Sequence, residues 1–134
     1  MNDFHPHFLP TAVGSMPHMD AAEACSLVLH YLPEIPAWPQ LPKRSTNENM
    51  YVQYFESLPG FALEGGRAVI EAGERFDRDL EKLYSDYLAD ETQDYALSEE
   101  RAAGFVEMCR RLEKAPESLI AVKGQVTGPI SAGL

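Results

Sequence analysis

The stretch from Val122 to Leu134, Val-Lys-Gly-Gln-Val-Thr-Gly-Pro-Ile-Ser-Ala-Gly-Leu, decides which fold we expect. It continues an apolar run within residues 118–125 that is typical of a buried strand. Thr127-Gly128-Pro129 then predicts a turn, because Gly adopts positive φ and Pro lacks the N–H for a ladder but suits the first position of a helix. Strand-to-helix turns hold the active sites of α/β barrels, although an ordinary βα turn has the same composition.

Length, composition and charge limit the classes of function. The chain has 134 residues, 45% of them hydrophobic, and we expect a single domain over residues 1–134 with a flexible tail at residues 1–7. Eleven basic and 21 acidic residues give a net charge of −10, which argues against nucleic acid and anionic membranes as partners because their phosphates would be repelled. The sequence has no signal-peptide pattern and no run approaching the ~20 apolar residues of a membrane span, so we expect a cytoplasmic protein.

The two cysteines, Cys25 and Cys109, lie on the apolar sides of predicted helices. Buried thiols behave as small apolar residues, and a cytoplasmic protein keeps its thiols reduced. We therefore expect two buried, reduced thiols and no disulfide.

Hydrophobic periodicity and turn residues predict strands, helices and one hairpin along the chain. Asp20 is a good N-cap with Glu23 three residues later, and Pro33 ends that helix. Gly65-Gly66 supplies the positive φ that a two-residue hairpin turn needs. The predicted elements are a strand over 8–13, a helix over 20–32, a short strand over 35–38, a helix over 45–58, a hairpin of 61–64 and 67–70, a helix over 76–88 and a helix over 98–112.

Three segments carry a resemblance to a known family. Residues 123–131, Lys-Gly-Gln-Val-Thr-Gly-Pro-Ile-Ser, resemble the Lys-Gly-x-Leu-Thr-Gly-Pro-Val-Thr segment of cobalamin-independent methionine synthase. Residues 14–17, Gly-Ser-Met-Pro, resemble the Gly-Ser-aromatic-Pro turn after the first barrel strand of that family, with Met16 in place of the aromatic residue. Residues 47–55 and 59–62 are similar to its Glu-Pro-Glu-Arg-Asn-Asp-Met-Val-Glu-Tyr-Phe and Gly-Phe-Ala segments. The order agrees, and uroporphyrinogen decarboxylases and corrinoid-linked methyltransferases are looser matches.

The resemblance implies a fold and a reaction. A complete (β/α)8 barrel needs ~250 residues, so we expect a partial (β/α)8 TIM barrel, made of the early strands and helices of the N-terminal portion, with the 61–70 hairpin as an insertion. The family transfers a methyl group to a thiol such as homocysteine, in methionine biosynthesis, using a zinc-bound thiolate. The intact parent is then a zinc-dependent S-methyltransferase, and this chain alone is expected to be inactive.

The cofactor expectation follows from the same resemblance. In the family the zinc ligands are two cysteines, a histidine and a glutamate, all later than the segment that matches residues 123–131. We expect no cofactor in this chain, and zinc in the intact parent from ligands beyond Leu134. His5 and His7 are spaced like a metal pair, but they precede the first predicted strand, and a flexible tail is the simpler interpretation.

Two turns carry most of the expected substrate site. By the resemblance, Gly14 and Ser15 lie against the amino-acid end of homocysteine, where a backbone N–H and a hydroxyl can bind a carboxylate. Thr127 and Gly128 shape the same pocket, and His18 follows the first turn closely enough to touch substrate. Taken without the resemblance, each turn has a purely structural interpretation.

The other candidates lie in and after a proline-rich loop. Trp38, Lys43 and Arg44 could line a pocket for an anionic planar ligand such as a folate; alternatively, Trp38 covers the barrel end and both cations are solvated. The family's substrate-binding carboxylate aligns with Ser45, so Glu48 becomes a substrate contact only if the loop shifts. The expected ligands of the intact parent are a small-molecule thiol and a folate.

Other functions remain open. The parent could be a corrinoid-linked methyltransferase or a decarboxylase of the same superfamily, which a His-x-Cys motif and a later Cys would distinguish. At this length the chain could instead be a non-catalytic binding or assembly module. A barrel cut after its early strands would leave unpaired edges and apolar helix faces, so we also expect a homo-oligomer.

Overall fold

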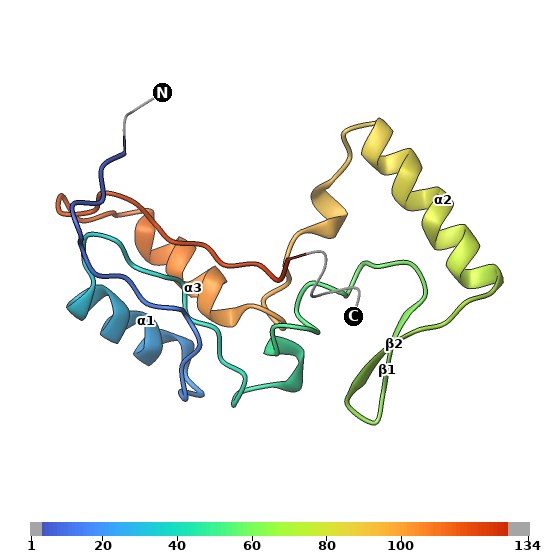
Figure 1. Cartoon of the computed structure of the whole chain (residues 1–134), viewed down its shortest axis with the longest axis horizontal. Helices are drawn as coiled ribbons and strands as arrows, with labels where there is room; N and C mark the ends of the chain where they lie inside the picture. The colour runs from blue at the N-terminus through green and yellow to red at the C-terminus, as the bar shows by residue number, and fades with distance from the viewer. Residues whose placement is uncertain (1–3, 129–134) are drawn as a thin grey trace.

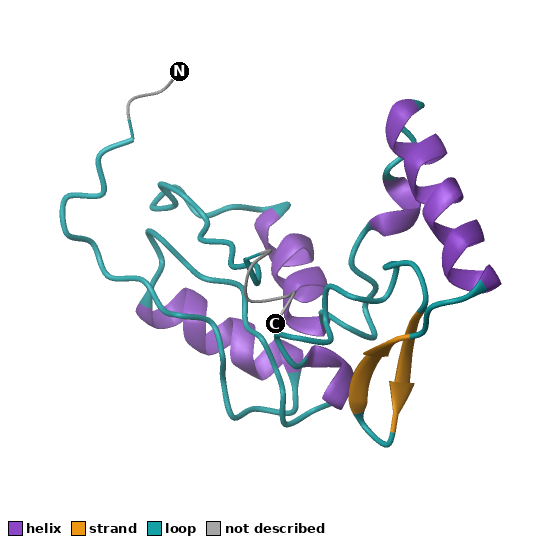
Figure 2. Cartoon of the chain, turned by 45° about the vertical axis from the view of Figure 1, so that its right-hand side comes forward, coloured by secondary structure: helices purple, strands orange, loops and turns teal. Residues whose placement is uncertain are grey.

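Three helices and one hairpin form the regular structure of residues 4–128, the part of the chain that the computed structural model describes (Figure 1). In chain order the elements are α1 (Ala21–Tyr31), the 3-10 turn η1 (Thr46–Glu48), β1 (Phe61–Glu64), β2 (Arg67–Ile70), α2 (Glu74–Leu88), the 3-10 turn η2 (Gln93–Tyr95) and α3 (Ala103–Leu112). Helices α1 and α3 pack together, whereas α2 and the hairpin stand apart from them in both views (Figures 1 and 2).

The core lies between α1 and α3. Cys25, Val28, Trp38 and Met108 are buried together there. The Trp38 ring meets the Phe105 ring nearly edge-on, with centroids 5.7 Å apart and planes at 71°. Such aromatic pairs add stability beyond the apolar area that they bury.

An N-cap sets the start of α1, and a glycine on α3 lets that helix pack closely. Asp20 caps the helix as predicted, because its side chain accepts a hydrogen bond from the Glu23 N–H at 2.8 Å. On α3, Gly104 permits close approach, since a Cβ there would lie only 2.1 Å from the carbonyl oxygen of Pro39. The Cys25 thiol donates to the Gly104 carbonyl at 3.4 Å, which ties the two helices together.

Three extended segments run beside these helices and pair over short lengths, without forming a continuous sheet. Ser15 and Gln40 form one isolated parallel bridge, and Ala37 and Lys123 form another. The Met16 N–H donates to the Gln40 carbonyl at 2.9 Å. The middle segment therefore joins the first motif to the last one.

This arrangement corrects the predicted fold class. We expected a partial (β/α)8 barrel with repeated parallel strands, but the described residues form a small α/β domain with three helices and a two-stranded antiparallel sheet. Pro36 and Pro39 stand in the middle extended segment, and neither has an N–H with which to continue a ladder. The resemblance was found mainly at turns, so it did not show that these prolines interrupt the pairing of strands.

The segment at residues 118–126 is not the buried strand that its apolar run predicted. Exposure alternates along it, so that Ile120, Val122 and Val126 face solvent with 53%, 45% and 71% of their surfaces exposed. This alternation has the period of a strand with a covered face and an open face. No described layer covers the open face.

The hairpin prediction is confirmed. Phe61 pairs with Ile70 and Glu64 pairs with Arg67 across the antiparallel strands β1 and β2. Gly65 and Gly66 form the turn with φ of +56° and +82°, the conformation that Gly adopts without steric cost.

Two helix predictions near the middle of the chain differ in outcome. The helix expected over 45–58 is wrong: after η1 the chain makes irregular turns, and the Asn49 side chain accepts a hydrogen bond from the Tyr51 N–H at 3.0 Å. Asn side chains compete with helical hydrogen bonding in this way. The amphipathic helix expected over 76–88 is confirmed as α2, although none of its residues is buried.

The last helix is shorter than predicted and exposes one thiol. α3 begins at Ala103 instead of Ser98, and Cys109 is exposed, so only Cys25 is a buried thiol. Both cysteines are free, as expected. Among residues 4–128, no helix combines the length and apolar character needed to cross a membrane.

Candidate functional site

The three resemblance segments meet in space. Gly14 lies against the side chain of Gln125, because a Cβ on Gly14 would be 2.0 Å from Gln125 Nε2. The Tyr54 hydroxyl donates to the Gln125 carbonyl, and the Thr127 hydroxyl donates to the Met50 carbonyl at 2.6 Å. Segments that lie far apart in the sequence thus form one cluster, which we call the motif cluster: residues 14–15, 50–54 and 123–128.

Gly14 and Gln125 are fitted to each other. Gly14 has a φ of +119°, which disfavours any residue with a Cβ. The Gln125 carboxamide donates to the Trp38 carbonyl at 3.0 Å, while its oxygen is buried without a hydrogen-bond partner among the described residues. The cluster therefore holds an acceptor that still lacks a donor.

At the first turn, the serine that we expected to contact substrate lies at the surface. Ser15 is exposed, and its backbone is held by the bridge to Gln40. His18 is partly buried, and its Nδ1 has no hydrogen-bond partner among residues 4–128. Lys123, which the predicted site did not include, donates from Nζ to the Val13 carbonyl at 3.1 Å. Gly128 is exposed at the other turn, with free space around its Cα.

Trp38 lies in the core and not at a pocket mouth. Only 5% of its surface is exposed, and it packs among Cys25, Val28 and Met108. An indole ring that is buried to this extent cannot stack on a ligand unless the core opens. The structure favours the alternative in which Trp38 has a packing role, and it separates Trp38 from the exposed Lys43.

Glu48 is buried and already satisfied by the protein. Its Oε2 accepts from the Leu41 N–H at 3.1 Å, and its Oε1 pairs with Arg44 Nη1 at 2.7 Å. The Arg44 guanidinium also donates to the Glu100 carbonyl at 3.4 Å. This ion pair secures the loop around η1, so both Glu48 and Arg44 already have partners within the protein.

A buried polar network escaped the sequence-based predictions. Gln40 Nε2 donates to Gln53 Oε1 at 2.8 Å, and Gln53 Nε2 donates to the Arg101 carbonyl at 2.6 Å. Arg101 donates to the Val52 carbonyl at 3.1 Å, and its Nε lies 2.8 Å from Glu56 without the alignment of a hydrogen bond. The only sequence signal for this network is the presence of polar residues between apolar ones. That pattern is equally typical of a solvated turn.

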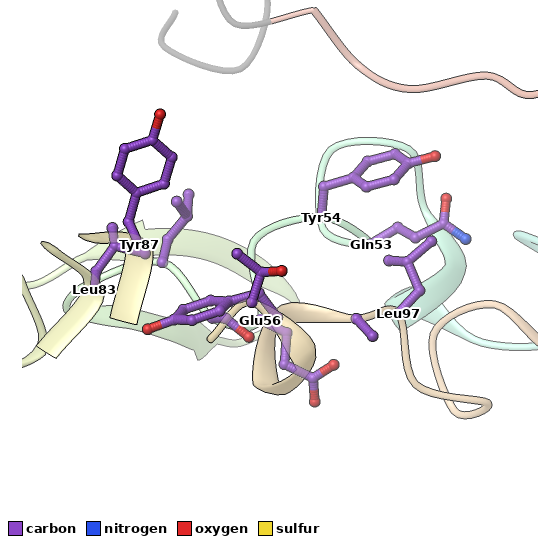
Figure 3. Close-up of a pocket in the computed structure, with 11 residues that line it drawn as sticks. Gln53, Tyr54, Glu56, Leu83, Tyr87 and Leu97 are labelled. Atoms are coloured by element: carbon purple, nitrogen blue, oxygen red, sulfur yellow. The ribbon is translucent and has the colours of Figure 1, made fainter. Parts of the chain in front are cut away.

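An apolar cavity of about 330 Å³ lies between the turns after η1, α2 and the segment around η2 (Figure 3). In that view Leu83 and Tyr87 lie on one side, and Gln53, Tyr54 and Leu97 lie on the other. Burial raises the pKa of the Tyr54 hydroxyl, so Tyr54 stays protonated and can donate its hydrogen bond at neutral pH. Tyr54 therefore belongs both to the cavity wall and to the motif cluster.

The described residues do not offer a donor set for zinc. Burial raises the pKa of the Cys25 thiol to about 11, and the thiol is used in the bond to Gly104, so it is a poor metal ligand. Cys109 is exposed near the C-terminal end of α3. Within residues 4–128, no three His, Cys, Asp or Glu side chains gather at ligand distances.

Comparisons with family models, with curated proteins and with solved structures found no match to this chain.

Proposed function

We propose that this chain supplies substrate-binding residues for methyl transfer to a small thiol amino acid such as homocysteine. The observation that carries the proposal is the motif cluster, in which segments that resemble the methionine synthase family separately converge. The contacts of Gly14 and Tyr54 with Gln125, together with the contact of Thr127 with Met50, join all three segments. Chance turn sequences have no reason to meet in this way.

The chemistry of the cluster suits the polar end of an amino acid. The Ser15 hydroxyl is exposed and can donate to a carboxylate. The side-chain oxygen of Gln125 adds a buried acceptor that has no donor among residues 4–128. In this proposal the chain binds and orients the amino-acid end of the thiol substrate. We also propose a cytoplasmic location, which the free thiols Cys25 and Cys109 support.

The proposal is tested by titrating the full, isotope-labelled chain with L-homocysteine and following its amide NMR signals. We expect saturable shifts at millimolar ligand for the amides of Ser15, Gly124, Gln125 and Thr127, and no such shifts with propanethiol, which lacks the amino-acid end. Ser15→Ala should weaken binding by about threefold to tenfold, the value of a hydrogen bond to a charged group. Ser85→Ala, an exposed serine on α2, is the matched control.

Three results would contradict the proposal. The first is an absence of shifts in the motif cluster at saturating homocysteine. The second is equal binding of propanethiol. The third is an equal loss of affinity in the Ser15→Ala and Ser85→Ala variants, with both variants shown by urea unfolding to be as stable as the natural chain.

A further inference from the structure

Helix α2 turns its apolar side toward the cavity of Figure 3 and not toward the core. The helix is strongly amphipathic, yet none of its residues is buried. Tyr87 and Leu88, at its C-terminal end, expose 72% and 83% of their surfaces. Contiguous apolar groups that are rimmed by polar residues mark interaction sites on proteins. The cavity wall is completed by Tyr54, Leu58, Leu83, Tyr95, Ala96 and Leu97.

Negative charge collects at the end of α2 where a cation would be favoured. The C-terminus of a helix is the negative end of its dipole, but the last turn of α2 contains no basic residue. Instead, a groove there is lined by the carboxylates of Asp86, Asp90, Glu91 and Asp94 together with Lys82. The chain carries an excess of acidic residues as a whole, and this groove concentrates it.

The cation in this groove is already engaged. Lys82 Nζ lies 2.5 Å from Asp86 and 3.7 Å from Asp94. Hydrogen bonds from Lys82 and Tyr95 lower the pKa of Asp86, so that carboxylate remains ionised. Among residues 4–128, the side chains of Asp90 and Glu91 have no ion-pair partner, and they lie three and four residues after Tyr87. A third hollow shares Leu58 and Tyr95 with the apolar cavity and Lys82 and Asp94 with the acidic groove, so the cavity and the groove adjoin. The groove holds one cation, Lys82, against four carboxylates.

We propose that the cavity and the carboxylates of Asp90 and Glu91, together called the α2 surface, bind a basic amphipathic segment of a partner protein. An apolar side chain of that segment fills the cavity, and a lysine or arginine about one helical turn away meets the two carboxylates. Charge complementarity selects this partner over an acidic one and over a second copy of the chain, whose net charge of −10 opposes close pairing at this groove. The α2 surface shares Tyr54 with the motif cluster, and the test changes only residues outside that cluster.

The test measures fluorescence anisotropy of a labelled synthetic peptide with leucine and lysine at helical spacing, titrated with the full chain. We expect saturable binding that weakens with added salt, and none with a peptide in which glutamate replaces every lysine. The pair Asp90→Asn with Glu91→Gln should weaken binding about fivefold, since rim charges contribute modestly. Glu113→Gln with Glu117→Gln removes the same charge at exposed positions elsewhere and should leave binding unchanged.

The apolar anchor is tested separately. Tyr87→Ser should weaken binding about tenfold, while Tyr87→Phe retains it, because the ring and not the hydroxyl forms the wall. Tyr31→Ser is the matched control, since Tyr31 on α1 is 69% exposed. Equal effects of the two serine variants, or of the two charge-removing pairs, would overturn the proposal. A dimer of the chain that Tyr87→Ser dissociates in sedimentation would also overturn it, because a second copy would then be the occupant.

Discussion

Single residues in the motif cluster are constrained by backbone conformation as well as by contacts. Gly14 combines a φ of +119° with a side-chain amide 2.0 Å from the position of an added Cβ. The amide of Gln125 cannot simply swing away, since it donates to the Trp38 carbonyl. Gly128, in the other turn, has no atom of residues 4–128 within 4 Å of an added Cβ and no left-handed φ.

We predict that Gly14→Ala lowers the free energy of unfolding by about 2 kcal/mol, from strain in the left-handed region and from displacement of Gln125. Gly128→Ala should change it by less than about 0.5 kcal/mol. Urea unfolding followed by circular dichroism measures both. In a Gln125→Ala background the displacement is absent and the strain remains, so Gly14→Ala should there cost only the backbone share. Equal stability of Gly14→Ala and Gly128→Ala would contradict this reasoning.

At the scale of elements, the loop around η1 is held by buried polar side chains in place of regular structure. Glu48 exposes only 1% of its surface and satisfies the Leu41 N–H as well as Arg44. Only the carboxylate of this pair is buried, since the Arg44 side chain is 34% exposed. Removing the carboxylate leaves the buried Leu41 N–H without an acceptor and a cavity in its place, which costs more than the ion pair contributes. The loop should therefore depend on this one carboxylate.

We predict that Glu48→Ala lowers the free energy of unfolding by about 3 kcal/mol, and that Glu48→Gln has a smaller effect because its amide oxygen can still accept from Leu41. Glu99→Ala is the control, since Glu99 pairs with Arg110 where both side chains are more than half exposed. That exposed pair should contribute less than about 1 kcal/mol. Chemical unfolding of the three variants compares them directly, and a Glu48→Ala protein as stable as Glu99→Ala would refute the role of Glu48.

At the scale of the whole molecule, the outer side of the extended segments is apolar and open. Val13 exposes 80% of its surface, and Lys123 ties the segment that holds Ile120, Val122 and Val126 to the Val13 carbonyl. The original reason for expecting an oligomer, the cut edges of a barrel, does not apply to this fold. The exposed side chains of Val13, Ile120, Val122 and Val126, which we call the apolar stripe, provide a different reason to expect an oligomer. Exposed apolar groups of this kind favour association of two copies of the chain.

We predict a homo-oligomer that forms through this stripe at micromolar concentration, and sedimentation equilibrium measures it. Val122→Lys with Val126→Lys should return the chain to a monomer, because two like charges per subunit would meet across a two-fold interface. Leu63→Lys, on the hairpin at 38% exposure, should leave the association intact. A monomeric natural chain would contradict the prediction, and so would dissociation by Leu63→Lys alone.

Local physics made part of this fold predictable. The cap at Asp20, the Gly65-Gly66 turn and the amphipathic pattern of α2 each depend on residues within a few positions of one another, and each was located from the sequence. The candidate site was predictable only as separate turns. Ser15 and Thr127 could be named from their motifs, but their shared neighbourhood could not, because no local pattern encodes a contact across the chain.

Local sequence was enough to locate the start of α1, the hairpin turn and the amphipathic helix α2, because capping, positive φ and amphipathic periodicity act over short separations. Tertiary contacts settled that the extended segments pair over short lengths, that Glu48 is buried and that α2 borders a cavity. Those outcomes depend on contacts such as Gln53 with Arg101, 48 residues apart, and Tyr54 with Gln125, 71 residues apart. The free energy of such a contact depends on how deeply packing buries it and on which partner groups packing supplies. Neither can be read from the residues next to it in the sequence.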